Sequence, residues 1–177
     1  MFDAFGYFPG QTDVKGETTD DDFTKKGAFE VLSFEIGAEN NVNIGSISGG
    51  AGAGKASFKE LNFTKKTDTA SCAMFNKLCV GEHFAEFIIE LRRQSGTAAG
   101  KGASGLTFLK WEFKLVMIQD IAWSGSDGDD VCEETVVAQF GAMKVTYVPQ
   151  NQDGSPNSKD KKVTEWSRVK NKATYAV

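Results

Sequence analysis

A glycine-rich segment that ends in lysine comes closest to a catalytic motif in this sequence. Residues 49–56 read GGAGAGKA, which matches the glycine and lysine positions of a phosphate-binding P-loop. In a P-loop, a Ser or Thr directly after the lysine binds magnesium, and a helix begins there. Ala56 stands at the hydroxyl position, and Ser57–Thr64 alternates like a strand. We therefore predict a glycine-rich surface loop here rather than a nucleotide site.

The single histidine adds little chemistry. A Ser–His–Asp or Cys–His relay would have to use His83. This residue directly follows the predicted end of a helix, where a histidine commonly binds backbone carbonyls or packs. A zinc site would combine it with Cys72 or Cys79, but the sequence has no CxxC or HxxxH spacing. We therefore expect no catalytic relay, no metal and no cofactor.

An acidic segment, Asp127–Asp130, has some of the character of a calcium loop. Counting from Asp127, the sixth position is Cys132 instead of glycine and the twelfth is Ala138 instead of glutamate. The calcium interpretation therefore fails. A basic segment follows later in the sequence, at 159–172. We expect these two oppositely charged segments to be either solvated loops or complementary patches between subunits.

Size and charge exclude several classes of partner. The 177 residues are expected to form a single domain, 1–177, with a sizeable core. A net charge of −4 argues against nucleic acid, and no apolar run approaches the roughly 18 residues of a membrane span. Three cysteines without paired spacing indicate folding in a reducing cytoplasm. The N-terminus, MFDAFGYFPG, lacks the features of a signal peptide.

The hydrophobic pattern predicts a mainly β protein: an antiparallel β-barrel of two curved sheets with one flanking α-helix. Strands are expected at Phe2–Phe8, Ala28–Glu39, Lys55–Thr64, Phe84–Arg93, Thr107–Met117, Glu133–Pro149 and Val163–Val169. The helix is expected at Thr69–Val80, capped by Asp68 and ended by Gly81. Polar or small-residue loops are expected at Gln11–Gly27, Asn40–Gly54 and Gln94–Gly105.

One strand carries a signal for curvature. Val136, Ala138 and Phe140 alternate in one phase, and Met143 and Val145 continue in another after a shift at Gly141. A glycine at such a shift suggests a β-bulge, which bends a sheet. The sequence therefore predicts a protein whose role depends on its shape more than on a reactive site.

Several short motifs are spread over nearly the whole chain. They are VKGE at 14–17, EVLSF at 30–34, GAGK at 52–55, LNFTK at 61–65, GEH at 81–83, LRR at 91–93, ETV at 134–136, VTYVPQ at 145–150 and EW at 165–166. In this order and spacing they resemble the haemolysin-coregulated protein (Hcp) family, the tube component of bacterial type VI secretion. The resemblance implies a non-enzymatic β-barrel that forms hexameric rings. It further implies that the rings stack into a tube, contact spike and sheath components, and are expelled with effector proteins inside.

Within that interpretation we expect Ser33 and Glu35 to face the lumen, opposite the apolar face of their strand. We expect Asn43, Ile44 and Ile47 to lie in a loop that bridges to a neighbouring subunit. Such a protein would be cytoplasmic before firing and then secreted without a cleaved signal peptide. Two alternatives stay open: a monomeric barrel that binds a small ligand in its interior, and a nucleotide-using enzyme built on the glycine-rich segment.

Overall fold

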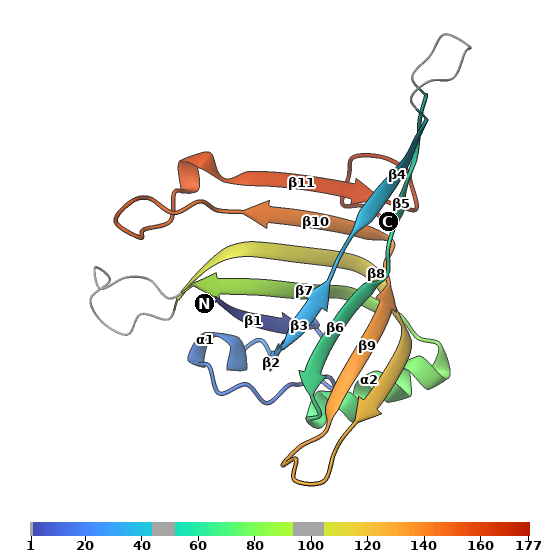
Figure 1. The fold of residues 1–177 in the computed structure, drawn as a ribbon, viewed down its shortest axis with the longest axis vertical. Coiled ribbons are helices and arrows are strands. Elements are labelled where there is room, and N and C mark those ends of the chain that lie inside the picture. The colour runs from blue at the N-terminus through green and yellow to red at the C-terminus, as the bar shows by residue number, and fades with distance from the viewer. Residues whose placement is uncertain (1, 44–51, 94–104) are drawn as a thin grey trace.

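The computed structural model describes residues 2–43, 52–93 and 105–177 and shows two antiparallel sheets (Figure 1). In spatial order, the first sheet contains β2 (Phe29–Glu30), β1 (Phe2–Tyr7), β7 (Phe84–Arg93), β8 (Leu106–Ser124), β10 (Ala142–Tyr147) and β11 (Lys162–Ser167). The second contains β8, β9 (Glu133–Gln139), β6 (Leu61–Lys66) and β3 (Ser33–Glu35). The expected mainly β, antiparallel class is confirmed.

Strand β8 belongs to both sheets because it bends in its middle. Its first half pairs with β7 and β10, and its second half pairs with β9. The bend lies where Leu115 adopts a φ of 52° and where the Gly141 amide donates to the carbonyls of Lys114 (2.9 Å) and Leu115 (3.2 Å). The predicted shift at Gly141 is therefore confirmed, but the prediction of one strand at Glu133–Pro149 was wrong, because β9 and β10 are separate strands on either side of Gly141.

The expected closed barrel is not observed as a continuous ladder. The path of paired strands ends at β2 and β3, which pair with β1 and β6 rather than with each other. Val31 and Leu32 connect them, and their amides donate to Ala4 and Thr64 in opposite sheets, each over 2.8 Å. The prediction of one strand at Ala28–Glu39 was therefore wrong, because the chain crosses between sheets there. Leu32 is 47% exposed instead of joining an apolar face.

A two-stranded hairpin extends away from the sheets at the upper right of Figure 1. It consists of β4 (Ala38–Asn43) and β5 (Gly52–Phe58), and we call it the arm. Residues 40–43 and 52–54 were predicted to lie in a loop but belong to these strands, while the rest of that predicted loop lies outside the described residues. The prediction of one strand at Lys55–Thr64 was wrong, because β5 and β6 divide it. The ladder satisfies the backbone of residues whose glycine-, asparagine- and alanine-rich composition gives little strand signal. The Lys59 amide donates to the Gly37 carbonyl (2.9 Å) at its base.

The core between the sheets is built from phenylalanines. Phe63 lies between Phe29 and Phe87, with ring centroids 5.8 and 5.2 Å apart respectively. Phe87 also faces Phe113 at 6.4 Å. Each of these rings is at most 2% exposed. Side chains therefore fill this interior, and burial of so much aromatic surface is the main stabilising contribution.

The principal helix, α2 (Thr69–Val80), lies behind β6 and β9 in Figure 1 and has the predicted bounds. Asp68 caps its N-terminus in a capping box with Ser71, and Gly81 ends it with a φ of 70°. A second, short helix, α1 (Asp21–Thr24), occupies part of the expected loop at Gln11–Gly27. Asp20 caps it because its carboxylate accepts two backbone amides. A single 3-10 turn, η1, covers Ser158–Asp160.

A buried ionic cluster joins α2 to the second sheet. Lys65 is fully buried, and its ammonium lies 2.9 Å from Glu134 Oε1 and 2.7 Å from Asp68 Oδ1. Glu134 also accepts from the Ser71 hydroxyl (2.9 Å) and the Trp123 indole (2.8 Å). The cluster fixes the helix against β6 and β9, since each buried charge there has several partners.

The face of β8 that carries Lys110, Glu112 and Lys114 is partly covered. Glu112 is buried and pairs with Lys110 (3.2 Å) and Lys144 (3.1 Å). Tyr175, in the C-terminal segment, donates to Glu86 Oε1 (2.7 Å) and its ring lies under the Lys144 ammonium. Charged residues therefore alternate with core residues along β8. Neighbouring charged side chains and the C-terminal segment cover these charged residues.

Candidate assembly surfaces

The outer face of the second sheet carries mostly small polar side chains. Ser33 lies opposite Thr64, and Thr64 lies opposite Thr135, so the three form a row across β3, β6 and β9. The Ser33 and Thr64 hydroxyl oxygens share a hydrogen bond of 2.7 Å. Glu35 lies opposite Asn62 in the next row. We call the surface formed by these five residues the polar wall; on β6 and β9 the neighbouring Leu61, Phe63 and Val136 point into the core.

The two residues expected to face the lumen are thus brought to one surface. Ser33 and Glu35 are both exposed on the polar wall, on the side away from the core. Glu35 is the only charged member of the wall, and its carboxylate lies 3.9 Å from the exposed Lys59 ammonium. Solvent screening at such a distance makes this pair weak.

Of the three predicted bridging residues, the structure describes only Asn43, at the far end of the arm. Asn43 is the last residue of β4 and pairs with Gly52. Ile44 and Ile47 lie outside the described residues. The prediction that these three contact a neighbouring subunit therefore stays a prediction.

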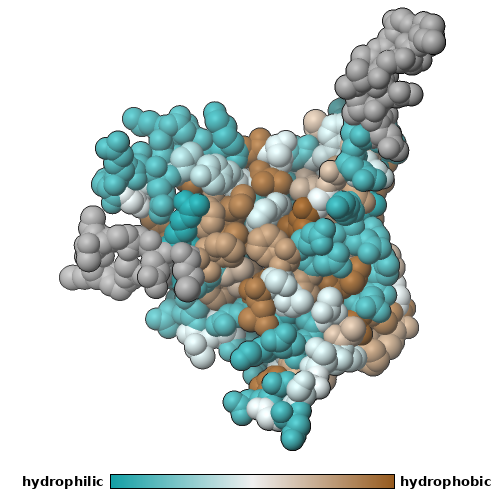
Figure 2. Space-filling model, viewed as in Figure 1, coloured by the Kyte–Doolittle hydropathy of each residue, from teal (hydrophilic) through white to brown (hydrophobic). Residues whose placement is uncertain are grey.

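An apolar surface runs over β8 and β10, near the middle of Figure 2. Leu109 lies opposite Tyr147 and Trp111 lies opposite Val145, with Met143 following on the same face. Tyr147 is 39% exposed and the other four are partly exposed. We call these five residues the apolar shelf. Alternation predicted that Leu109 and Trp111 share a face, but the pattern did not reveal that this end of the face is uncovered.

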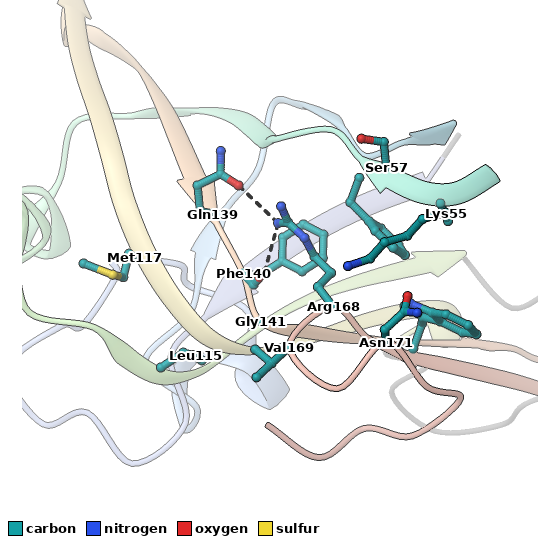
Figure 3. A pocket seen from close by; sticks show the side chains of 13 residues that line it. Lys55, Ser57, Leu115, Met117, Gln139, Phe140, Gly141, Arg168, Val169 and Asn171 are labelled. Carbon is teal, nitrogen blue, oxygen red and sulfur yellow. Dashed lines mark hydrogen bonds between the residues drawn. The ribbon is translucent and has the colours of Figure 1, made fainter. Parts of the chain in front are cut away.

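A cleft of about 650 Å³ lies at the base of the arm, where β5 meets the bend of β8 and the segment after β11 (Figure 3). Its lining includes apolar and aromatic side chains, among them Phe58, Leu115, Met117, Phe140, Trp166 and Val169. Two cations, Lys55 and Arg168, also line it. We call this hollow the arm-base cleft.

Arg168 gives the arm-base cleft its electrostatic character. Its Nη1 donates to Gln139 Oε1 (3.1 Å) and to the Phe140 carbonyl (3.0 Å), and the guanidinium lies 5.0 Å from the Phe140 ring centroid. Burial lowers the pKa of Arg168 from its ordinary value. Among the described residues, neither Arg168 nor Lys55 has a carboxylate within 4 Å. The cleft is therefore an apolar hollow with uncompensated positive charge.

The positions that suggested chemistry in the sequence do not come together. Gly52–Ala56 lies in β5 rather than at a helix N-terminus, which removes the structural context of a P-loop. His83 is exposed between α2 and β7. In the described ranges, no group of three or more His, Cys, Asp or Glu side chains is arranged to hold a metal ion. The three cysteines are free and exposed.

Sequence reasoning missed the arm-base cleft. Lys55, Gln139 and Arg168 are far apart in the chain and meet only because the bend at Leu115 brings β5, β9 and the end of β11 together.

None of the helices described by the structure is both long and apolar enough to cross a bilayer.

Comparison with known proteins identifies relatives over most of the chain. The family described as "Type VI secretion system effector, Hcp" matches residues 8–147. Protein hcp1 of Pseudomonas aeruginosa (strain PAO1) is 28% identical over 101 residues, which is 57% of this chain. The matched region spans 59% of the length of that relative.

Solved structures share the fold almost end to end. One, described as a type six secretion system protein, has 30% identity and a TM-score of 0.85, covering 98% of this chain and 100% of that chain. Hcp1 from Salmonella typhimurium has 26% identity and a TM-score of 0.72, covering 98% and 99% respectively. With the family match over 8–147, these alignments show that the chain belongs to the Hcp family of type VI secretion tube proteins.

Proposed function

We propose that this chain is a structural subunit of a type VI secretion tube, that six copies close into a ring, and that stacked rings carry effector proteins in their lumen. The observation that carries the proposal is that one well-packed core leaves two surfaces of opposite character uncovered. These are the polar wall on the second sheet and the apolar shelf on the first.

The apolar shelf is the surface expected to bind the adjacent subunit of a ring. An apolar surface that stays partly exposed in the single subunit marks a protein–protein contact more often than a solvent-facing region. In the described structure, β10 is the only strand that pairs with β11, and apart from Ser167, which bridges to Lys172, its outer edge offers unpaired backbone groups to a neighbour. A head-to-tail contact through these features closes a ring when its rotation divides a full turn.

The polar wall is the surface expected to line the lumen. Its hydroxyl and amide groups can form hydrogen bonds with cargo, while Glu35 alone contributes charge. Neutral polar groups already bonded to water or to each other add little net free energy per contact. Such a wall can hold a protein and still release it, which suits transport better than permanent binding.

A structural role fits the interior better than the alternative of a small ligand inside the barrel. Phe29, Phe63 and Phe87 occupy the space between the sheets with ring centroids 5.2 to 6.2 Å apart. We therefore place the work of this protein on its surfaces and assign it no enzymatic step. The same proposal makes it cytoplasmic before firing and secreted afterwards, with effectors, spike and sheath components as partners.

Native mass spectrometry of two matched variants tests the ring. Tyr147→Glu places a charge on the most exposed residue of the apolar shelf and should reduce the six-subunit species in favour of the 19.2 kDa monomer. Val80→Glu changes a residue that is 58% exposed at the end of α2, and it should assemble like the parent protein. A parent protein that stays monomeric at every concentration would contradict the proposal, and so would a Tyr147→Glu variant that assembles fully.

A further inference from the structure

The turn between β8 and β9 is an exposed acidic projection. Residues 125–132 contain Asp127, Asp129 and Asp130, followed by Val131, which is 45% exposed. Asp129 is used within the turn, where its carboxylate accepts the Ser126 amide over 2.7 Å. In the described part of the chain, Asp127 and Asp130 have no cation within 4 Å. We call this segment the acidic turn.

The acidic turn and the arm-base cleft lie at opposite ends of the same strand. Met117 lines the cleft, and Ser124 ends β8 at the turn. The intervening strand spans roughly 23 Å at ~3.3 Å per residue. Figure 1 shows the turn at the bottom of the molecule and the base of the arm above it, along the longest axis. The two surfaces are therefore separated along one direction and cannot contact each other within one subunit.

The two surfaces match in both charge and polarity. The cleft offers Lys55 and Arg168 beside apolar side chains such as Met117. The turn offers the unpaired carboxylates of Asp127 and Asp130 beside an exposed valine. An anion beside the half-buried Arg168 would offset the desolvation of its guanidinium. Carboxylates with an exposed apolar side chain beside them form the kind of segment that such a hollow accepts.

We propose that the acidic turn of one copy docks in the arm-base cleft of a second copy of this chain, and that this contact joins one ring to the next. This docking proposal rests on the proposed function, because it assumes that rings form. The contact is heterologous, because the turn and the cleft lie at opposite ends of each subunit. A subunit whose turn is docked still has an open cleft at its other end, so the contact can repeat along one axis. Charge matching further orients the rings, because two acidic ends or two basic ends repel.

A charge-swap experiment separates this contact from ring formation. Lys55→Glu and Asp130→Lys should each lower the association constant between rings by about tenfold, since each turns an attraction into a repulsion. The double variant restores opposite charges and should recover most of that loss. Native mass measures the ring, and electron microscopy and sedimentation measure how many rings join. Both residues are exposed, so the folded subunit should be retained.

Two control variants carry the same charge changes elsewhere. Lys161→Glu and Asp21→Lys alter exposed residues outside both surfaces and should stack like the parent protein. Single variants that form rings and stack normally would overturn the docking proposal while leaving the proposed function intact. A double variant that stacks no better than the single variants would overturn it as well. Absence of rings from the parent protein would overturn both proposals.

Discussion

The amide of Gly141 lies opposite Leu115 at the point where the two sheets diverge, and it donates to the Leu115 carbonyl over 3.2 Å. At this point Leu115 adopts a left-handed φ of 52°, a backbone conformation that L-residues rarely adopt. A Cβ at Gly141 would lie 3.1 Å from the Leu115 Cβ and 3.0 Å from Val177 Cγ1. The bend that forms the arm-base cleft therefore includes a close approach at which any side chain would have to displace Leu115 or Val177.

Gly141→Val should destabilise the protein because its side chain has no room beside Leu115. Overpacking of this kind typically costs about 1–3 kcal/mol. Chemical denaturation monitored by tryptophan fluorescence measures the change. Ala122→Val adds the same branched side chain at an exposed position of β8 and should stay within about 0.5 kcal/mol of the parent protein. Equal stabilities for the two variants would contradict the role assigned to Gly141.

Lys65→Met should be among the most destabilising single substitutions in the second sheet. It leaves the buried carboxylate of Glu134 without its cation, a change that costs about 3–5 kcal/mol. Adding Glu134→Gln removes the stranded charge, so the double variant should be more stable than Lys65→Met alone. A double-mutant cycle of unfolding free energies measures this coupling. Strictly additive effects would show that the two side chains act independently.

Stability should fall in acid partly through Glu90. Burial opposes its ionisation, but hydrogen bonds from Tyr7 (2.5 Å) and Lys26 (2.9 Å) outweigh it and hold the pKa of Glu90 below its usual value. A lowered folded-state pKa contributes stability above the unfolded-state pKa, and that stability is lost as the pH falls through the folded-state value.

Glu90→Gln should therefore lower the free energy of unfolding at neutral pH by about 1–3 kcal/mol. Its stability should also decline less than that of the parent protein when the pH is lowered below the ordinary glutamate pKa. Thermal or urea unfolding across an acidic pH series measures both effects. Parallel pH dependences for variant and parent would contradict this account.

The orientation of the polar wall can be tested by labelling. In a background with Cys72, Cys79 and Cys132 replaced by serine, Thr135→Cys should react with a small maleimide in assembled tubes but be slowed at least several-fold toward a large polymer-linked maleimide. Asn76→Cys, on an exposed position of α2, should react with both reagents. Equal access of the large reagent to both positions would show that the wall does not face an enclosed lumen.

Local signals explain which elements the sequence predicted. The helix α2 has its predicted bounds because Asp68 and Gly81 are a cap and a stop that act over one turn. Strand β7 also has its predicted bounds, Phe84–Arg93. The shift at Gly141 was visible because it breaks a regular alternation. Each of these features is encoded by residues that are neighbours in the chain.

Features that depend on distant partners were not predictable in this way. Phe29 and Phe34 belong to one predicted strand, Ala28–Glu39, but they lie in β2 and β3, which pair with different sheets, and only the tertiary structure determines where the chain crosses. The arm was missed because backbone pairing, not side-chain propensity, makes it a strand. Likewise, Arg168 and Lys55 meet only after folding, so the sequence could not reveal the arm-base cleft.

The most direct test of the account is the structure of the assembled protein by cryo-electron microscopy. We predict rings of six subunits in which Ser33 and Thr64 line the central hole and the apolar shelf is buried against the adjacent subunit. Single unassembled molecules would contradict the central claim, and so would rings in which the polar wall faces outward.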